Sequence, residues 1–116
     1  MATDSSCIFC KIVRKEIPAQ EVLRDEHVVA FADLNPQAPT HVLVVPTEHA
    51  AHLSDFMHSA TPERAARLLS AAAEIGRRFG RDGYRVVMNE GPDGGQTVHH
   101  LHAHVLAGRH RTWPPG

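Results

Sequence analysis

Histidine residues are concentrated near the end of this chain, where five of the ten fall within twelve positions. Side chains alternate between the two faces of a β-strand, so residues two apart share a face. If residues 97–107 form a strand, His100, His102 and His104 lie on one face, and the other face is mostly small and apolar. Neighbouring imidazoles would then lie roughly 6.5–7 Å apart. The spacing therefore predicts a strand with three imidazoles on one side and a core-facing surface on the other.

The loop before this strand favours phosphate chemistry. Gly94-Gly95-Gln96-Thr97 places backbone N–H groups and a hydroxyl beside the histidine row, and successive N–H groups can form an anion-binding concavity. Transfer of a phosphoryl or nucleotidyl group needs an in-line nucleophile and donors on the non-bridging oxygens. A neutral imidazole nitrogen can attack phosphorus and form a covalent intermediate. We expect the central His102 to attack, and Thr97 or a protonated histidine to protonate the leaving group.

Two plainer interpretations of the histidine row remain open. The row can be a set of solvated histidines on an exposed strand face, although the apolar residues that flank it argue against this. It can also be a set of metal ligands, because histidine is a common ligand of zinc.

Hydrophobic periodicity and end signals predict one short and one long helix. The short helix is expected at 7–16, with Ser5 or Ser6 as its cap, and the long helix at 61–79, with Thr61 as its cap. One apolar face of the long helix is expected from Ala65, Leu68, Leu69, Ala72, Ile75 and Phe79. Strands are expected at 22–23, 27–32, 41–45, 84–89 and 97–107, and loops at 35–39 and 90–95.

The order of these elements predicts an α+β fold. Short connections without regular βαβ alternation favour an antiparallel sheet with the helices packed on one side. The length of 116 residues fits a single domain, 1–116, in which residues 1–6 are expected to be disordered and residues 108–116 to form a C-terminal arm.

Composition excludes several classes of protein. The formal net charge of −1, with no long run of one sign, gives no indication of a nucleic-acid or membrane partner. No stretch approaches the roughly 20 apolar residues of a membrane span, and the first residues lack a signal-peptide pattern, so we expect a cytoplasmic protein. Two cysteines are too few for a disulfide framework.

The sequence His100-Leu101-His102-Ala103-His104-Val105-Leu106 resembles the His-x-His-x-His motif of the histidine triad superfamily. Five further stretches resemble its Hint branch, a group of nucleotide-binding proteins with nucleoside phosphoramidase activity, and together they cover nearly the whole chain: 7–18, 35–46, 87–90, 94–97 and 113–116. The diadenosine polyphosphate hydrolases share the triad but lack the Trp-Pro-Pro-Gly ending of this chain.

The resemblance implies a two-fold α+β homodimer that binds purine nucleotides such as AMP or GMP. It also implies hydrolysis of nucleoside 5′-phosphoramidates, such as adenosine monophosphoramidate, through a nucleotidyl-histidine intermediate and without a catalytic cofactor. By position, His102 resembles the nucleophile, His104 the phosphate-binding histidine, His41 the histidine that supports the triad, and Thr97 the hydroxyl donor. The nucleotide-binding residues implied in the same way are Asp33 at the ribose, Asn89, Gly95, Gln96 and Thr97 at the phosphate, and Phe9, Ile12, Phe31 and Leu34 around the base.

Two positions depart from the pattern of the family. Thr97 stands where many relatives have serine, so the hydroxyl is kept but gains a methyl group and loses rotamers. His99 stands where many relatives have tyrosine, and strand alternation turns it away from the triad, so we do not expect it in catalysis.

Cys7 and Cys10 form a Cys-x-x-Cys whose sulfur atoms share one side of a helix. A structural zinc ion would need about two more ligands, and His49 and His100 are the candidates, an arrangement that some family members resemble. Two free structural thiols are a second interpretation. A redox pair is a third, although no strand is expected before Cys7.

Three other functions compete with phosphoramidate hydrolysis. The triad can hold phosphate without catalysis, in a nucleotide-binding or zinc-binding module, or it can serve a dinucleoside polyphosphate hydrolase. A small redox protein would rest on the two cysteines alone. The intact triad together with Thr97 favours the phosphoramidase.

The tail at 113–116 is expected to cross a dimer interface and to reach the leaving-group pocket of the partner.

Overall fold

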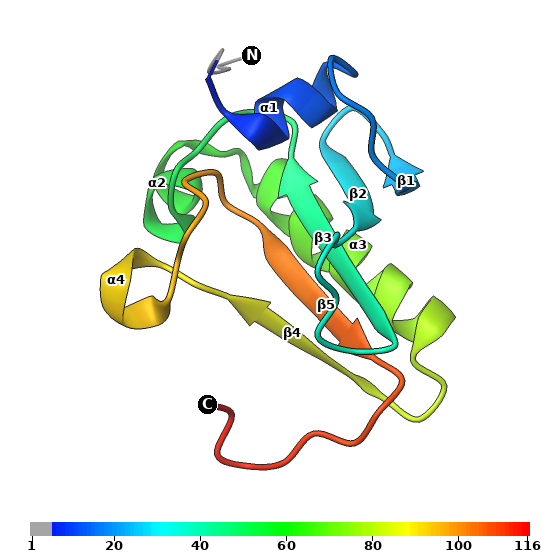
Figure 1. The fold of residues 1–116 in the computed structure, drawn as a ribbon. Helices are drawn as coiled ribbons and strands as arrows, with labels where there is room; N and C mark the ends of the chain where they lie inside the picture. The colour runs from blue at the N-terminus through cyan, green and yellow to red at the C-terminus, as the bar shows by residue number, and fades with distance from the viewer. Residues whose placement is uncertain (1–5) are drawn as a thin grey trace.

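The computed structural model describes residues 6–116, which form a five-stranded antiparallel sheet with helices on both faces (Figure 1). The elements in chain order are α1 Ile8–Val13, β1 Glu21–Arg24, β2 Val28–Ala32, β3 Thr40–Pro46, α2 Leu53–Ser59, α3 Pro62–Phe79, β4 Tyr84–Met88, α4 Gly91–Gly94 and β5 Ala103–Ala107. The strand order in the sheet is β1-β2-β3-β5-β4, and every neighbouring pair is antiparallel. The α+β prediction is confirmed.

The sheet carries an apolar core on each of its faces. One core packs β2, β3 and β5 against α3 and includes Val28, Val44 and Leu101. The other packs β2 and β3 against α1 and includes Phe9 and Val29. The expectation that all helices lie on one side is therefore wrong. Strands β2 and β3 are buried at all but one position each, as in a sheet that is covered on both faces, and so they require a helix on each side.

The long helix α3 begins and ends where its end signals predict. The Thr61 hydroxyl accepts the Arg64 N–H at 3.3 Å, and Gly80 follows the last helical residue. The buried face of the helix differs from the expected one, because Leu69 and Phe79 are 55% and 39% exposed. The residues that are buried are Leu68, Ala71, Ala72, Ile75 and Gly76.

The first helix and the last strand are both shorter than predicted. The thiol of Cys7 accepts the Cys10 N–H at 3.4 Å, so Cys7 caps α1 in place of the expected Ser5 or Ser6. Residues 1–5, which include Ser5 and most of the segment expected to be disordered, lie outside the described residues. The strand expected at 97–107 begins only at residue 103. The Leu101 N–H donates to the carbonyl of Ala50 at 2.7 Å, outside the sheet, so the backbone before β5 follows an irregular path.

Two helices were not expected. Helix α2 fills the connection between β3 and α3 and buries Phe56, and the four-residue α4 occupies the loop expected at 90–95. No helix among residues 6–116 has both the length and the apolar character that crossing a membrane requires.

The chain beyond β5 runs along the end of the sheet without helix or strand (Figure 1). Arg85 of β4 donates to the carbonyl of Thr112 at 3.0 Å, and Arg111 donates to the carbonyl of Gln37 at 2.7 Å. These two bonds attach the segment to its own domain. Trp113 is 83% exposed, so none of the residues 6–116 covers it.

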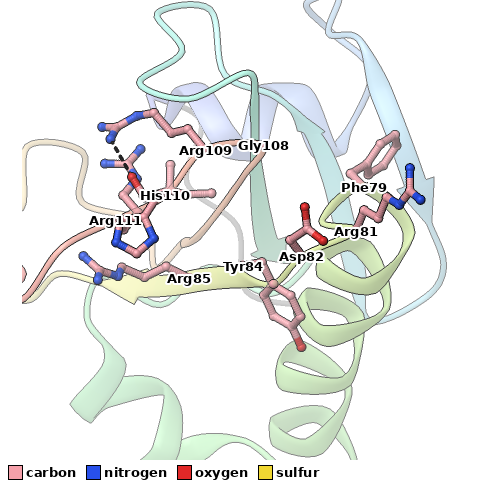
Figure 2. A pocket seen from close by; sticks show the side chains of 11 residues that line it. Phe79, Arg81, Asp82, Tyr84, Arg85, Gly108, Arg109, His110 and Arg111 are labelled. Carbon is pink, nitrogen blue, oxygen red and sulfur yellow. Dashed lines mark hydrogen bonds between the residues drawn. The ribbon is translucent and has the colours of Figure 1, made fainter.

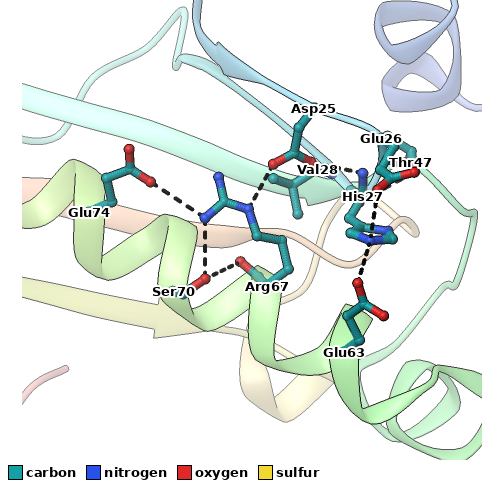
Figure 3. Close-up of polar contacts among 9 residues, drawn as sticks. All are labelled: Asp25, Glu26, His27, Val28, Thr47, Glu63, Arg67, Ser70 and Glu74. Carbon is teal, nitrogen blue, oxygen red and sulfur yellow. Dashed lines mark hydrogen bonds and ion pairs between the residues drawn. The ribbon is translucent and has the colours of Figure 1, made fainter.

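The turn between β1 and β2 is tied to α3 by one carboxylate (Figure 3). Asp25 accepts the N–H groups of His27 and Val28 at 2.8 and 2.9 Å, which places His27 in the turn rather than in the strand expected at 27–32. Its second oxygen accepts from Arg67 of α3 at 2.7 Å. Burial by itself would raise the pKa of Asp25, but the hydrogen bonds from His27, Val28 and Arg67 outweigh burial and lower it.

We expect the contact between Gly76 of α3 and Tyr84 of β4 to control stability. A Cβ at position 76 would lie 2.3–2.5 Å from ring atoms of Tyr84, so Gly76→Ala should destabilise the fold by about 1–3 kcal/mol through overpacking. With Tyr84→Ala present, the sign should reverse, because alanine is the better helix former by about 1 kcal/mol. Denaturant unfolding of the four proteins measures the cycle, and a Gly76→Ala effect that is the same in both backgrounds would contradict it.

Candidate functional site

A pocket of about 260 Å³ lies between α1 and the sheet, and His102 and His104 are part of its wall. The rest of the wall is mostly apolar, with Asp33 and Thr97 as further polar members. Eight of the residues predicted from the sequence line it: Phe9, Ile12, Phe31, Asp33, Leu34, Thr97, His102 and His104. Sequence reasoning missed seven lining residues: Ile8, Pro18, Ala19, Gln20, Ala32, Leu43 and Val98. Ile8, Ala32 and Val98 adjoin a predicted residue in the chain, and the other four gave no signal.

His102 is held in one orientation by the backbone before β5. Its Nδ1 lies 2.7 Å from the carbonyl oxygen of His100, and because a carbonyl only accepts, Nδ1 carries the hydrogen. The neutral ring therefore keeps its lone pair on Nε2. Phe9 packs edge-on against the ring at a centroid distance of 5.1 Å, and the residue is 8% exposed. The geometry leaves one nucleophilic nitrogen and shields the rest of the ring.

His104 is oriented by a second imidazole instead of by a carbonyl. The backbone N–H of Gln37 donates to Nδ1 of His41 at 3.0 Å, so the hydrogen of neutral His41 is on Nε2. That Nε2 lies 2.9 Å from Nδ1 of His104 and donates to it. Neutral His104 therefore carries its own hydrogen on Nε2, where it can donate to a ligand oxygen. The two imidazoles of the pocket thus differ: His102 offers a lone pair and His104 offers a hydrogen.

Burial keeps His104 and His41 neutral. Burial lowers the pKa of His104 to about 4, and the positive charges that His102 and His41 would carry lower it further. Burial also lowers the pKa of His41, with the Asp33 carboxylate opposing the effect. Near neutral pH the relay from Gln37 through His41 to His104 is therefore uncharged.

Asp33 lies beside the relay without becoming part of a metal site. One carboxylate oxygen accepts the Asn35 N–H at 2.8 Å, and the other lies 3.5 Å from Nε2 of His41. Candidate ligand atoms of Asp33, His41 and His104 lie within 4.8 Å of one another. His41 has its hydrogen on that side and its lone pair bound to Gln37, so it has no electron pair to give a metal there.

Three of the predicted phosphate contacts do not line the pocket: Asn89, Gly95 and Gln96. The Gln96 amide donates to the carbonyls of Ala51 and Val98 and accepts the N–H of Gly91, which uses both of its N–H groups. Asn89 donates to the carbonyl of Gly94 at 2.6 Å, and Gly95 adopts φ +80° after α4. These residues shape the loop, and Thr97 is the member of the predicted phosphate group that reaches the wall.

Cys7, Cys10, His49 and His100 form a second cluster, adjacent to the pocket, whose candidate ligand atoms all lie within 4.8 Å of one another. The Nδ1 of His100 lies 3.3 Å from Cys7 Sγ, 3.5 Å from Cys10 Sγ and 3.2 Å from His49 Nδ1. His49 Nδ1 lies 3.4 Å from Cys10 Sγ. Four residues predicted as ligands from distant parts of the chain thus meet at one point.

The donor set fits a tetrahedral zinc ion. With Zn–N bonds of about 2.0–2.1 Å and Zn–S bonds of about 2.3 Å, a tetrahedron separates two nitrogens by roughly 3.3 Å and nitrogen from sulfur by roughly 3.6 Å. The observed separations of 3.2–3.5 Å match. His100 also has the required tautomer, because its Nε2 donates to the carbonyl of Pro46 at 2.9 Å and leaves a lone pair on Nδ1.

Comparison with known proteins gives close matches. A family model described as "HIT domain" matches residues 14–111. A 14 kDa zinc-binding protein of Zea mays is 47% identical, with 97% of this chain and 90% of that protein covered. The crystal structure of a HIT family hydrolase from Legionella pneumophila superposes with a TM-score of 0.90 at 44% identity, covering 96% of this chain and 100% of that one. A zinc-bound histidine triad family protein from Mycobacterium smegmatis gives a TM-score of 0.78 at 31% identity, covering 96% and 80%.

The buried state of His104 predicts a pH-dependent stability. Its pKa of about 4 in the folded protein lies below the ordinary value of 6.5, so between these values the unfolded chain binds more protons than the folded one. This contribution to the free energy of unfolding should be complete above pH 6.5 and should be lost as the pH falls toward 4. Denaturant unfolding from pH 7.5 to 4 measures it.

The matched variants for this experiment are His104→Gln and His110→Gln. The first removes the buried imidazole and should flatten the pH profile, and the second removes an exposed one and should leave the profile as in the wild type. Identical profiles for the wild type and His104→Gln would contradict the assignment.

Proposed function

Because the chain belongs to the HIT domain family, we propose that it is a hydrolase that cleaves the P–N bond of purine nucleoside 5′-phosphoramidates. The observation that carries the proposal is the pairing of complementary imidazoles in one pocket. His102 keeps a free Nε2 lone pair, and His104 keeps an Nε2 hydrogen. A nucleophile and an oxygen-directed donor are the two groups that transfer of a nucleotidyl group requires.

In the first step, Nε2 of His102 attacks phosphorus and the P–N bond to the amine breaks. The departing nitrogen takes up a proton, for which the hydroxyl of Thr97, on the pocket wall, is the candidate donor, and it leaves as a neutral amine. The new N–P bond gives the His102 ring a positive charge. The Nδ1–H bond to the His100 carbonyl, 2.7 Å long, stabilises that charge.

In the second step, water attacks the phosphorus of the nucleotidyl-histidine. The bond from phosphorus to Nε2 breaks, its electron pair returns to the imidazole, and the proton lost by the water restores the Thr97 hydroxyl as the nucleoside monophosphate forms. His104 donates to a non-bridging oxygen in both steps, and His41 keeps it in the donating tautomer. Neutral His104, with a pKa of about 4, is suited to donate while its own charge stays unchanged.

The remainder of the pocket suits a nucleoside. Phe9, Ile12 and Phe31 give an apolar wall for the base, and Leu34, which is 99% exposed, stands at the rim. The Asp33 carboxylate lines the same pocket, and a carboxylate can accept hydrogen bonds from ribose hydroxyls. The wall presents few hydrogen-bonding groups to a base, which supports recognition of purines by stacking and shape.

We assign a structural zinc ion to Cys7, Cys10, His49 and His100, and no metal to the reaction. When bound, zinc supplies a cross-link between α1, the segment after β3 and the segment before β5. His100 ligates through its ring while its carbonyl orients His102. The ion therefore stabilises the position of the nucleophile from behind the pocket.

We also propose that two copies pair into a dimer. Strand β4 has one neighbour, β5, so its outer edge is open to a second strand. The exposed Trp113 and the C-terminal segment would then meet the second copy and contribute to its leaving-group side, and the second copy would cover a ring that the described part of this chain leaves exposed.

Replacement of the nucleophile tests the reaction. His102→Ala should lower the turnover of an adenosine phosphoramidate that carries a fluorescent amine by at least about a thousandfold, because no neighbouring group can form the covalent bond. AMP binding should persist. His99→Ala is the matched control, since His99 is exposed and packs near His52, and it should retain wild-type turnover. Near-normal turnover of His102→Ala would exclude the covalent mechanism.

Replacement of the sulfur ligands tests the metal. Purified without chelator, the wild type should contain about one zinc per chain, and Cys7→Ser with Cys10→Ser should contain little. The melting temperature should fall in this double variant, because metal bound to the folded state stabilises it. Turnover should largely survive. Elemental analysis and calorimetry measure these effects, and a zinc-free wild type of unchanged stability would show that the cysteines are free thiols.

A further inference from the structure

A second pocket, of about 660 Å³, lies beyond the C-terminal end of β5. Its wall comes from three segments: the connection from α3 to β4, the start of β4, and residues 108–111 after β5 (Figure 2). It shares no lining residue with the pocket of His102 and His104. The proposed hydrolysis therefore leaves this pocket without a role.

Four arginines line the second pocket, which we call the arginine pocket: Arg81, Arg85, Arg109 and Arg111. Figure 2 shows Arg85, Arg109 and Arg111 gathered with His110 on one side, and Arg81 with Asp82 on the other. Asp82 is the one carboxylate among the lining residues. Within residues 6–116, none of the four guanidinium groups forms an ion pair with a carboxylate. The pocket wall thus carries an excess of positive charge, with four guanidinium groups and one carboxylate.

The hydrogen bonds of the three gathered arginines go to neutral carbonyls. Arg85 donates to Thr112 and Arg111 to Gln37, at 3.0 and 2.7 Å, and Arg109 donates to the neighbouring His110 at 3.2 Å. Each of these bonds uses one of the five N–H donors of a guanidinium. The bonds to Thr112 and Gln37 fix the direction of two side chains, and most donors stay available for an anion.

Arg111 has both a donor without an acceptor and like charges nearby. Its Nε is buried and has no acceptor in the described part of the chain. Burial lowers its pKa, and the charges of Arg109 and Arg85 lower it further. An anion between these guanidinium groups would relieve the repulsion and would bring an acceptor close to Arg111.

Guanidinium groups match phosphoryl oxygens in geometry, because the planar fork of N–H groups can bind two oxygens at once. Three such groups, from two segments, favour an anion with more than one phosphoryl group over a single small ion. The volume falls in the range of small-molecule sites. The net charge of the whole chain, −1, and the confinement of this cluster to one pocket do not fit a nucleic-acid backbone.

We propose that the arginine pocket binds a small anion with two or three linked phosphoryl groups, either free or carried by a nucleotide. The test is isothermal titration calorimetry of the full chain with pyrophosphate and tripolyphosphate at low salt. Metal content is measured before and after, so that chelation by the anion is not taken for binding. Saturable binding that weakens as salt is added is the expected result.

Three substitutions locate the binding. Arg109→Gln and Arg111→Gln should each weaken tripolyphosphate binding about tenfold or more, in line with the loss of a charge-assisted bond. Arg77→Gln is the matched control, because Arg77 is exposed on α3 outside the pocket, and it should bind as the wild type. Arg109 is exposed and bonds only to its neighbour, so its substitution should leave the fold intact.

Two further titrations show whether the anion binds outside the pocket of His102 and whether a nucleotide can carry it. Excess AMP, which should fill the pocket of His102, should leave tripolyphosphate binding unchanged. ATP added in the presence of that AMP shows whether the phosphoryl chain can be carried by a nucleotide. Neither measurement requires turnover, so the result is independent of the proposed hydrolysis.

Three outcomes would overturn the proposal. The wild type could fail to bind either polyphosphate, or Arg109→Gln and Arg111→Gln could bind as tightly as Arg77→Gln. The arginine substitutions could also change the molecular mass in solution while no variant binds the anions. That last result would make the arginine pocket a contact between copies of the chain.

Discussion

The chemistry of this chain depends on hydrogen bonds that fix which nitrogen of each buried imidazole carries a hydrogen. The ring of His100 donates to the carbonyl of Pro46, and the ring of His102 donates to the carbonyl of His100. The backbone N–H of Gln37 fixes His41, which in turn fixes His104. Identical side chains thereby present different atoms, which suit the three proposed roles of metal ligand, nucleophile and oxygen-directed donor.

His100 connects its cluster with Cys7, Cys10 and His49 to the pocket of His102 and His104. Its ring faces the two cysteines and His49, while its carbonyl holds the ring of His102. A residue inside a regular ladder would have its carbonyl paired with the neighbouring strand. The irregular backbone before β5, in which the N–H of Leu101 bonds to Ala50, is therefore what allows one residue to serve both groups.

A continuous set of contacts also links the C-terminal segment to the pocket. Arg111 donates to the carbonyl of Gln37, and the N–H of Gln37 donates to His41, which donates to His104. The segment after β5 is thus hydrogen-bonded to the loop that orients His41. The arginine pocket and the pocket of His102 and His104 have no lining residue in common, and this series of hydrogen bonds joins Arg111 in the wall of one to His104 in the wall of the other.

The sequence by itself determined the α+β class, the antiparallel sheet, the bounds of α3 and the alternation that puts Leu101, Ala103 and Val105 into the core. Local propensity, end signals and period-two patterning suffice for these, because each depends on neighbours in the chain. The two cysteines and the abundance of histidine gave the candidate zinc ligands, and resemblance to a family supplied five members of the pocket wall: Phe9, Ile12, Phe31, Asp33 and Leu34. Only the tertiary structure decided the rest: the helix on each face, the late start of β5, the tautomers of His41, His102 and His104, and the grouping of four arginines. These depend on partners that are distant in the chain, such as Ala50 for Leu101 and Gln37 for Arg111, and no local pattern encodes which distant carbonyl a donor will meet.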